Sequence, residues 1–346
     1  MKLLVSALEP SSNLHLKEVL KHTYDVDLLG IFDKGIKEGT ALYDISEMAI
    51  MGVVDAIKKL RWFFKVADEM VELAKDADKV LLMDSSGFNL PLAKKLKEKY
   101  PDKEIIYYIL PQVWASRPKR VKKLEQYCDK LLGILPFEMD YYSSKAQYVG
   151  HPLLDEVNVH RNEEETKGCI AFMPGSRKSE ISRLMPIFLE LRRKFPEIRP
   201  LLVIPPSFDR NKIAKLYRGN REFEIVRNTH EALRRAEFAF ICSGTATLEA
   251  ALIGTPFTLA YIAKKVDFFI GTKLLGIKQV GLANIILTHY NNTTLHNEIL
   301  QEEVTVDNLL KEYYNTDRKI FAQKAEELKT YLSHGSSENV AKIIME

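Results

Sequence analysis

The segment EFAFICSGTATLEAALIGTP, residues 237–256, decides the fold. Its first six residues form a short apolar run rich in aromatic side chains, which predicts a buried strand. Ser243, Gly244 and Thr245 follow at once and open a helical pattern that stops at Gly254. A strand that runs directly into a helix is the unit from which parallel sheets are built. The segment therefore predicts an α/β protein with a parallel sheet.

The same alternation of strand and helix patterns continues in both directions along the chain. The first half contains predicted strands over 2–7, 26–32, 80–83, 105–109, 130–135 and 147–149. The second half contains predicted strands over 169–173, 201–204, 224–226, 237–242, 257–261 and 284–287. We expect two doubly wound, Rossmann-like sheets that face each other across a cleft, with ligands at the carboxyl ends of the strands.

A polar stretch over 158–167 separates the two halves and is the predicted linker, because it has no apolar periodicity. The expected domains are 1–157 and 168–303, followed by a helical tail over 304–346. The length of 346 residues suits two domains of ordinary size.

Composition excludes several classes of function. The formal net charge is only +3, so the chain lacks the basic field that non-specific nucleic-acid binding needs. The three cysteines have no short spacing, which predicts reduced core residues and a reducing compartment. The chain has no signal peptide pattern and no apolar stretch long enough to cross a bilayer, so we expect a cytosolic protein whose surface can still meet lipid.

The turn Ser243-Gly244-Thr245 is the first candidate ligand site. Backbone N–H groups at a helix start, a glycine that allows close approach and two hydroxyls together favour phosphate. Glu249 lies about one and a half turns further on, where its carboxylate can accept from ribose hydroxyls. Ordinary helix capping by Ser243 and Gly254 is the alternative interpretation.

A second turn of the same kind follows the strand over 169–173. Gly175 and Ser176 open another helix, and Arg177 adds a cation that can stabilise a departing diphosphate. Two such turns in one domain favour a diphosphate ligand. Local capping by Ser176 and Glu180, with Arg177 in solvent, is the alternative.

Two strand ends in the first half carry candidate catalytic groups. Asp84 follows the strand over 80–83 and is placed to act as general base toward a hydroxyl nucleophile, although capping also explains an acid there. Trp114, Arg117 and Arg120 follow the strand over 105–109, where an indole can stack on a sugar and a guanidinium can bind phosphate. A packed loop indole is the alternative.

The segment 48–66 reads as an amphipathic helix with cations beside its apolar side chains. Such a helix can lie on an anionic membrane or accept acyl chains, although most such stripes simply belong to a core. The candidate contacts are Val53, Ile57, Leu60, Trp62, Phe63 and Phe64.

No metal site is expected. Asp25 and Asp27 match the spacing of a carboxylate pair that binds a divalent ion, but they are far in sequence from both phosphate turns, and no His or Cys cluster replaces them. His151 stands before Pro152 near the predicted linker, and the sequence does not decide between ligand contact and packing.

Several short blocks occur together and in order. They are 50–54 (IMGVV), Asp84 with Phe88 and Asn89, 113–115 (VWA) with Arg117 and Arg120, 135–138 (LPFE), Gly150 with His151, 174–177 (PGSR) with Glu180, 243–245 (SGT) with 248–249 (LE), and 300–303 (LQEE). This combination resembles the lipid-A-disaccharide synthase family from about the first strand to Glu303.

The resemblance implies an inverting GT-B glycosyltransferase without a cofactor or metal. It would join UDP-2,3-diacylglucosamine to 2,3-diacylglucosamine 1-phosphate and release UDP, as a peripheral protein on the cytoplasmic face of the inner membrane; a homodimer stays open. It further implies that 1–157 binds the acceptor and lipid and that 168–303 binds the UDP-sugar. The implied donor contacts include Asn284 and Gln301, and the implied acceptor or cleft contacts include Glu9, Ser11 and Asn89.

The first turn departs from the family's pattern. The family reads Gly-Glu-x-Ser-Gly-Asp where this chain reads 8–13 (LEPSSN), so Glu9 and Ser11 remain while both glycines and the aspartate are replaced. The family's second acid after the one that matches Asp84 is Gly87 here. Two other functions remain possible on this scaffold: a UDP-sugar epimerase and a nucleotide-binding module without enzymatic activity.

Overall fold

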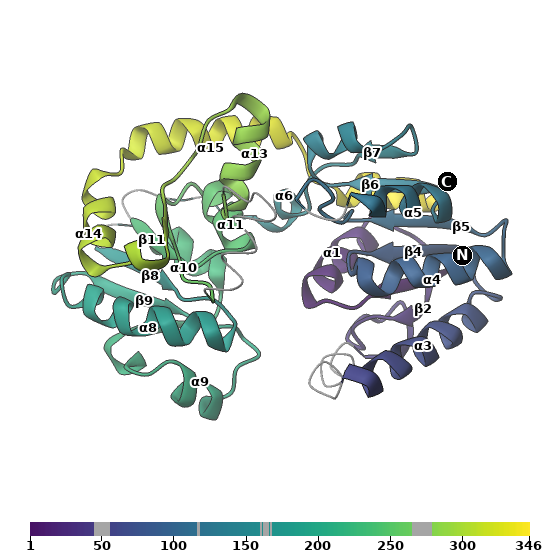
Figure 1. The fold of residues 1–346 in the computed structure, drawn as a ribbon, viewed down its shortest axis with the longest axis horizontal. Helices are drawn as coiled ribbons and strands as arrows, with labels where there is room; N and C mark the ends of the chain where they lie inside the picture. Colours follow the sequence, from purple (N-terminus) through teal and green to yellow (C-terminus); the bar gives the residue numbers. More distant parts are fainter. Residues whose placement is uncertain (45–55, 116–117, 160, 162–165, 167, 265–278) are drawn as a thin grey trace. The chain divides into compact units, whose positions relative to one another are not determined.

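The computed structural model describes residues 1–44, 56–115, 118–159, 161, 166, 168–264 and 279–346. The chain divides into two compact units (Figure 1). The first unit joins Met1–Glu156 to His334–Glu346, and the second is Val157–Ser333. The last segment of the chain therefore returns to the unit in which the chain began.

The first unit is built on a seven-stranded sheet in the order β3-β2-β1-β4-β5-β6-β7, in which the paired strands run parallel. β1 and β4, in its middle, are almost entirely buried, because helices cover both faces and leave no side exposed to water. The strands are β1 (Lys2–Ala7), β2 (Asp27–Ile31), β3 (Gly39–Tyr43), β4 (Lys79–Met83), β5 (Glu104–Tyr108), β6 (Lys130–Gly133) and β7 (Ala146–Tyr148).

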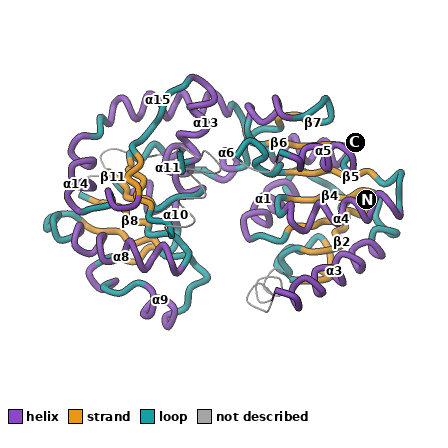
Figure 2. The backbone as a smooth tube through the Cα atoms, in the orientation of Figure 1, coloured by secondary structure: helices purple, strands orange, loops and turns teal. Residues whose placement is uncertain are grey.

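Helices cover both faces of this sheet (Figure 2). α3 (Ala56–Leu73), α4 (Ser86–Lys99) and α5 (Lys119–Tyr127) pack on one face. α1 (Pro10–Leu20) and α16 (Ser337–Met345) pack on the other and contact each other. A 3-10 helix, η1 (Pro136–Tyr141), follows β6, and the short α6 (Leu153–Glu156) ends the first stretch of this unit.

The second unit repeats the plan with six parallel strands in the order β10-β9-β8-β11-β12-β13. The strands are β8 (Cys169–Met173), β9 (Arg199–Val203), β10 (Glu224–Val226), β11 (Phe238–Ile241), β12 (Phe257–Tyr261) and β13 (Glu298–Leu300). The described helices are α8 (Lys178–Arg192), α9 (Arg210–Leu216), η2 (Asn220–Glu222), α10 (Thr229–Arg235), α11 (Thr245–Ile253), α13 (Leu282–Asn291), η4 (Gln301–Glu303), α14 (Val306–Asn315) and α15 (Arg318–Leu332). The prediction of two doubly wound parallel sheets is confirmed.

The predicted strand over 284–287 is wrong, because these residues lie inside helix α13. The β-branched pair Ile285-Ile286 suggested a strand, yet the buried positions Ala283, Ile286 and Leu287 follow the three- and four-residue spacing of a helix. Two edge strands, β3 and β13, were not predicted. Polar and apolar residues alternate only weakly in β3, and β13 is only three residues long. Neither strand therefore gives a clear periodic signal.

The tail over 304–346 is helical, as predicted. It is shared between the units, since α14 and α15 lie in the second and α16 in the first. All three cysteines are unpaired and buried. Within the described ranges, no helix is both long and apolar enough to cross a bilayer.

Candidate active site

Asp84 lies in a strained turn at the carboxyl end of β4. Asp84 and Ser85 both adopt positive φ, 49° and 35°, which side chains with a Cβ rarely do. Hydrogen bonds hold this turn: the amide of Asn89 donates to the carbonyls of Met83 and Asp84, both at 3.0 Å, and the hydroxyl of Tyr107 donates to the same Asp84 carbonyl. The backbone conformation thus fixes where the Asp84 carboxyl points.

Burial raises the pKa of the Asp84 carboxyl, while the backbone N–H of Ser85 and the charge of His15 oppose that rise. A carboxylate that is partly desolvated and more basic than usual is suited to accept a proton from a hydroxyl group.

Asp84 opens onto a pocket of about 580 Å³. The pocket combines two carboxylates and one ammonium with an apolar wall. Its lining residues are Leu8, Glu9, Phe63, Phe64, Ala67, Asp84, Ser85, Ser86, Gly87, Phe88, Pro91 and Lys95. The structure therefore brings three predicted residues, Glu9, Phe63 and Phe64, to the same hollow as Asp84. Lys95, Phe88 and Pro91 were not predicted; they lie on the helix after the Asp84 turn, so the spacing along α4 could have indicated them.

The remaining predicted acceptor residues are not among those that line this pocket. Asn89 is buried. Its amide nitrogen supports the turn, and its carbonyl oxygen accepts from the hydroxyl of Ser6 on β1 at 2.6 Å. Ser11 is exposed in the first turn of α1, and Arg120 lies on α5. Arg117 lies outside the described residues.

Trp114 is held by a buried acid. Its indole N–H donates to Oε1 of Glu138 at 3.0 Å, and its ring meets Phe137 edge to face. Burial raises the pKa of Glu138 to about 8, and its Oε2 has no hydrogen-bond partner among the described atoms. Glu138 is therefore neutral near pH 7 and keeps the Trp114 loop against η1.

The predicted membrane segment is only partly within the described structure. Val53 lies outside it, and Ile57 and Leu60 belong to α3 without described side chains. Trp62 and Phe63 are half-buried against the core, with Trp62 meeting Tyr43 edge to face and Phe63 contacting Phe88. Phe64 is 50% exposed. Core packing thus accounts for the apolar character of Trp62 and Phe63. Of these three side chains, Phe64 faces water.

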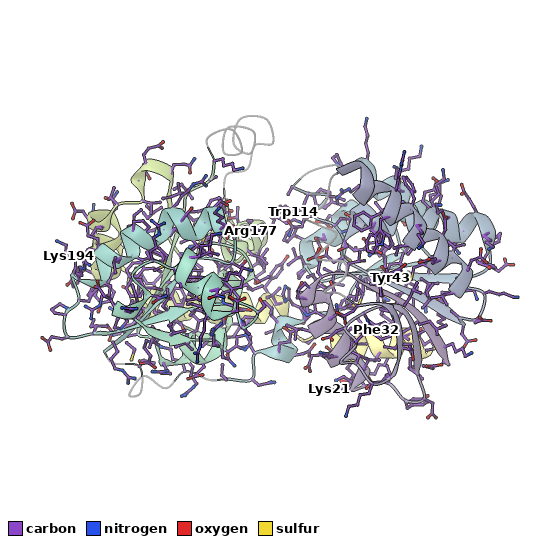
Figure 3. All side chains as sticks on the ribbon, turned by 90° about the horizontal axis from the view of Figure 1, so that it is seen from below. Lys21, Phe32, Tyr43, Trp114, Arg177 and Lys194 are labelled. Carbon is purple, nitrogen blue, oxygen red and sulfur yellow. The ribbon has the colours of Figure 1, made fainter. Side chains whose placement is uncertain are left out.

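In the second unit, the turn after β8 combines a glycine of positive φ with local capping by Glu180, which was the alternative interpretation. The N–H of Arg177 donates to Oε2 of Glu180 at 3.2 Å. Gly175 has φ +93°, and an added Cβ would lie 2.5 Å from Oε2 of Glu180, so any other residue would strain the backbone and displace the Glu180 carboxylate. Arg177, rather than Ser176, is the N-cap of α8. Its guanidinium donates to Glu180 at 2.8 Å while its side chain stays 77% exposed (Figure 3).

The turn after β11 also contains a glycine of positive φ, but its helix start is not capped by a side chain. Gly244 is the N-cap of α11, with φ 88° and no side-chain cap, so the helix N-terminus is open to a ligand. Gly254 ends the helix in the left-handed conformation, as expected. Ser243 thus precedes the cap and does not form it.

Both turns line one pocket of about 500 Å³. Its polar and charged lining comes mostly from the carboxyl ends of four neighbouring strands. The lining residues are Met173, Gly175, Ser176, Arg177, Glu180, Val203, Ile204, Pro205, Pro206, Arg227, Thr229, Ile241, Ser243, Gly244, Thr245 and Ala246. Two helix N-termini and two guanidinium groups at one hollow favour an anionic ligand with more than one charge.

Arg227 was missed by the sequence analysis. It follows β10, and its guanidinium donates to the carbonyls of Pro205 and Phe208, both at 2.9 Å. Ligand-binding residues were expected at the carboxyl ends of strands, and Arg227 occupies such a position. It was not selected because 224–228 contain no glycine or hydroxyl side chain to mark a phosphate turn.

Three predicted donor residues do not line this pocket. Glu249 is half-buried on α11 with its carboxylate 3.8 Å from Nε2 of His230. Asn284 is buried, donates to His296 and Glu298 and accepts from the backbone of Leu295. The third, Gln301, accepts from the N–H of Ala263 at 2.8 Å.

Asp25 and Asp27 lie at the start of β2, at the edge of the first sheet opposite Asp84. Among the described residues, no group of three or more His, Cys, Asp or Glu side chains is placed to hold a metal ion.

Comparison with solved structures identifies the fold. The calicheamicin glycosyltransferase CalG4 superposes with a TM-score of 0.63 at 12% identity, over 99% of this chain and 97% of that one. A UDP-GlcNAc 2-epimerase from Neisseria meningitidis, bound to UDP-GlcNAc, gives 0.61 at 11% identity, over 100% and 98%. Identities this low establish the fold alone, which is the GT-B fold of glycosyltransferases.

Sequence comparison is more specific. The model of the family described as lipid-A-disaccharide synthetase matches residues 3–345. A lipid-A-disaccharide synthase of Helicobacter pylori (strain J99) is 49% identical, over 98% of this chain and 96% of the relative. The chain belongs to the lipid-A-disaccharide synthase family and is a glycosyltransferase of lipid A biosynthesis. The family resemblance read from the sequence is confirmed, and the epimerase likeness is one of fold.

Proposed function

We propose that the chain transfers a 2,3-diacylglucosaminyl group from its UDP donor to the 6-hydroxyl of 2,3-diacylglucosamine 1-phosphate. The observation that carries this proposal is the division of chemistry between the units: a basic carboxylate with an apolar wall in one, and two helix N-termini with two guanidinium groups in the other. The first set suits an acylated acceptor, and the second suits a nucleoside diphosphate.

In this account, Asp84 takes the proton of the acceptor hydroxyl as the oxygen attacks the anomeric carbon. The bond from that carbon to the diphosphate breaks, and its electron pair leaves with UDP. Attack from the side opposite UDP inverts the anomeric configuration. Arg177 and the N-termini of α8 and α11 stabilise the charge that develops on the leaving diphosphate.

The donor site is expected to bind UDP without a divalent ion, because guanidinium and backbone N–H groups supply the positive charge. Calorimetry with a chelator present should detect binding by the full-length protein. Gly175→Ala should weaken binding at least tenfold, because the added Cβ displaces Glu180 and strains the turn. Gly168→Ala is the matched control, since Gly168 also has positive φ but precedes β8, at the end of that strand away from the pocket. Binding that appears only with magnesium would contradict this arrangement.

We also propose a role for Glu249 in the donor site. It lies on the helix whose N-terminus lines the pocket, so a ribose beyond the diphosphate would meet this helix. Glu249→Ala should weaken UDP binding less than Gly175→Ala, because it removes one hydrogen-bonding group and leaves both turns intact. The same calorimetry measures both variants, and unchanged affinity would remove Glu249 from the site.

The N-terminal part of α3 is proposed to touch the inner face of the inner membrane. Phe64 is half-exposed, with the ammonium of Lys95 5.7 Å from its ring centroid. An apolar side chain among cations favours reversible attachment to anionic lipid. Both substrates carry acyl chains, so a site that opens near the membrane would receive them directly.

Phe64→Ser should leave the melting temperature within about 2 °C of the parent, because exposed substitutions change stability little. It should reduce co-sedimentation with phosphatidylglycerol vesicles, and added salt should reduce it further. Tyr24→Ser, which changes an exposed aromatic side chain elsewhere, is the matched control. Trp62→Ser should instead lower the melting temperature, because Trp62 packs on the core. Vesicle binding unchanged in Phe64→Ser would exclude this residue from the membrane contact.

A further inference from the structure

A buried tyrosine behind the turn after β8 has no part in the account so far. Tyr217 is the C-cap of α9 and has no exposed surface. Its ring packs in the core of the second unit and meets Phe208 edge to face. Its hydroxyl donates to the carbonyl oxygen of Gly175 at 3.1 Å. Tyr217 therefore contacts the backbone of a residue that lines the donor pocket, the hollow of about 500 Å³ at the two turns.

The peptide that joins Gly175 to Ser176 connects this tyrosine to the pocket. In a trans peptide, the carbonyl and the following N–H point in opposite directions. The Gly175 carbonyl points toward Tyr217, which is not among the residues that line the pocket, whereas Gly175 and Ser176 both line it. The N–H of Ser176 therefore points away from Tyr217 and the core around it.

The N–H of Ser176 is available to a ligand. Among the described residues, no group accepts a hydrogen bond from it. The next N–H, that of Arg177, instead donates to Oε2 of Glu180 at 3.2 Å. An unpaired N–H that lines a pocket beside a helix N-terminus favours a phosphate oxygen as its acceptor.

The orientation of this peptide needs a restraint from outside the turn. Gly175 has φ 93° and no side chain, so its own residue does little to fix the peptide that follows it. The hydroxyl of Tyr217 supplies such a restraint at the Gly175 carbonyl. Burial raises the pKa of this hydroxyl, so it keeps its proton and remains a donor.

We propose that Tyr217 is a positioning residue of the donor site, whose hydroxyl holds the Gly175–Ser176 peptide so that the Ser176 N–H meets a phosphate group of the donor. The inference rests on the proposed binding of a nucleoside diphosphate in this pocket. A peptide that is already oriented loses less conformational freedom when the ligand binds, so the restraint increases affinity for the diphosphate.

The peptide can be observed directly in the full-length protein by nuclear magnetic resonance. The sequence contains two Gly-Ser pairs, 175–176 and 335–336, so ¹³C at glycine carbonyls combined with ¹⁵N at serine gives one signal from each. Gly175→Ala identifies the first signal by its loss. The second signal is an internal reference, because the N–H of Ser336 donates to Asp155 in the first unit at 2.9 Å.

Tyr217→Phe removes the hydroxyl and keeps the buried ring, so the variant should remain folded, which its melting curve checks. The carbonyl signal of Gly175 should move, because it loses its hydrogen bond, and the Ser336 signal should stay. Saturating pyrophosphate should shift the Ser176 N–H signal strongly in the parent and less in the variant. Tyr313→Phe is the matched control, since its hydroxyl donates to Glu237 in the same unit, away from the pocket.

Calorimetry with pyrophosphate and with UDP gives the second readout. Tyr217→Phe should weaken the binding of both by about threefold to tenfold, the effect of weakening one hydrogen bond, while Tyr313→Phe should bind as the parent does. A Gly175 carbonyl signal that does not move would overturn the inference. A signal that moves while affinity and the Ser176 response stay parental would show a purely structural hydrogen bond and overturn it too. If neither ligand shifts Ser176 in the parent, the proposed donor site is rejected and the inference with it.

Discussion

Asp84→Asn is expected to lower kcat by about two to four powers of ten, the usual contribution of a positioned proton acceptor. The amide keeps the size of the carboxyl but cannot accept the proton of the acceptor hydroxyl. The affinity for UDP should stay within about twofold, because the donor site is built in the second unit. Steady-state kinetics and calorimetry on one preparation test both statements.

Asp76→Asn is the matched control, since it makes the same charge change at an exposed position on the first unit. It should retain parental turnover. Circular dichroism should show that Asp84→Asn is folded, as expected for a side chain whose turn is held by backbone contacts and Asn89. Near-normal turnover in the folded variant would reject Asp84 as the base.

The second large effect concerns stability. The free energy of unfolding should decrease by several kcal/mol between about pH 5 and pH 9 through Glu138, because its pKa is raised to about 8 in the folded state. Below the pKa that Glu138 has in the unfolded chain, its carboxyl is protonated in both states, and its contribution to the free energy of unfolding is at its maximum. As pH rises toward the folded pKa, the unfolded state has already lost the proton, and this stabilisation disappears.

Glu138→Gln should remove this part of the pH dependence, since the amide cannot ionise and its oxygen can still accept from the indole of Trp114. Urea unfolding at pH 5.5 and pH 8.5 measures the difference between variant and parent, which separates Glu138 from other groups that titrate. Glu98→Gln, at an exposed position on α4, should behave as the parent does. If the free energy of unfolding of Glu138→Gln falls with pH as steeply as that of the parent, the prediction that Glu138 is protonated in the folded protein is wrong.

Strong periodic signals made much of the fold predictable. β8, β10 and β12 have the predicted bounds because each is a short apolar run between turn residues. The run over 284–287 failed because β-branched residues dominated a window too short to show helical spacing. The edge strand β13 is set by pairing with β12, a contact distant in sequence that no local pattern reports.

The candidate site was predictable where a backbone conformation is required. Gly175 and Gly244 have positive φ at helix starts, and glycine marks such positions in any sequence. Pairings across the fold were not predictable: the bond between Trp114 and Glu138 depends on tertiary packing. The same limit explains why Trp62 and Phe63 were predicted to contact the membrane. The spacing of apolar residues along a helix does not show which of them pack against the core.

The most direct test of the whole account is incubation of the full-length protein with UDP-2,3-diacylglucosamine and 2,3-diacylglucosamine 1-phosphate, with a chelator present, followed by mass spectrometry. The account predicts the acylated disaccharide 1-phosphate and UDP in equal amounts, with little product from Asp84→Asn. Recovery of both substrates unchanged, or conversion of the donor to an epimer without disaccharide, would contradict it.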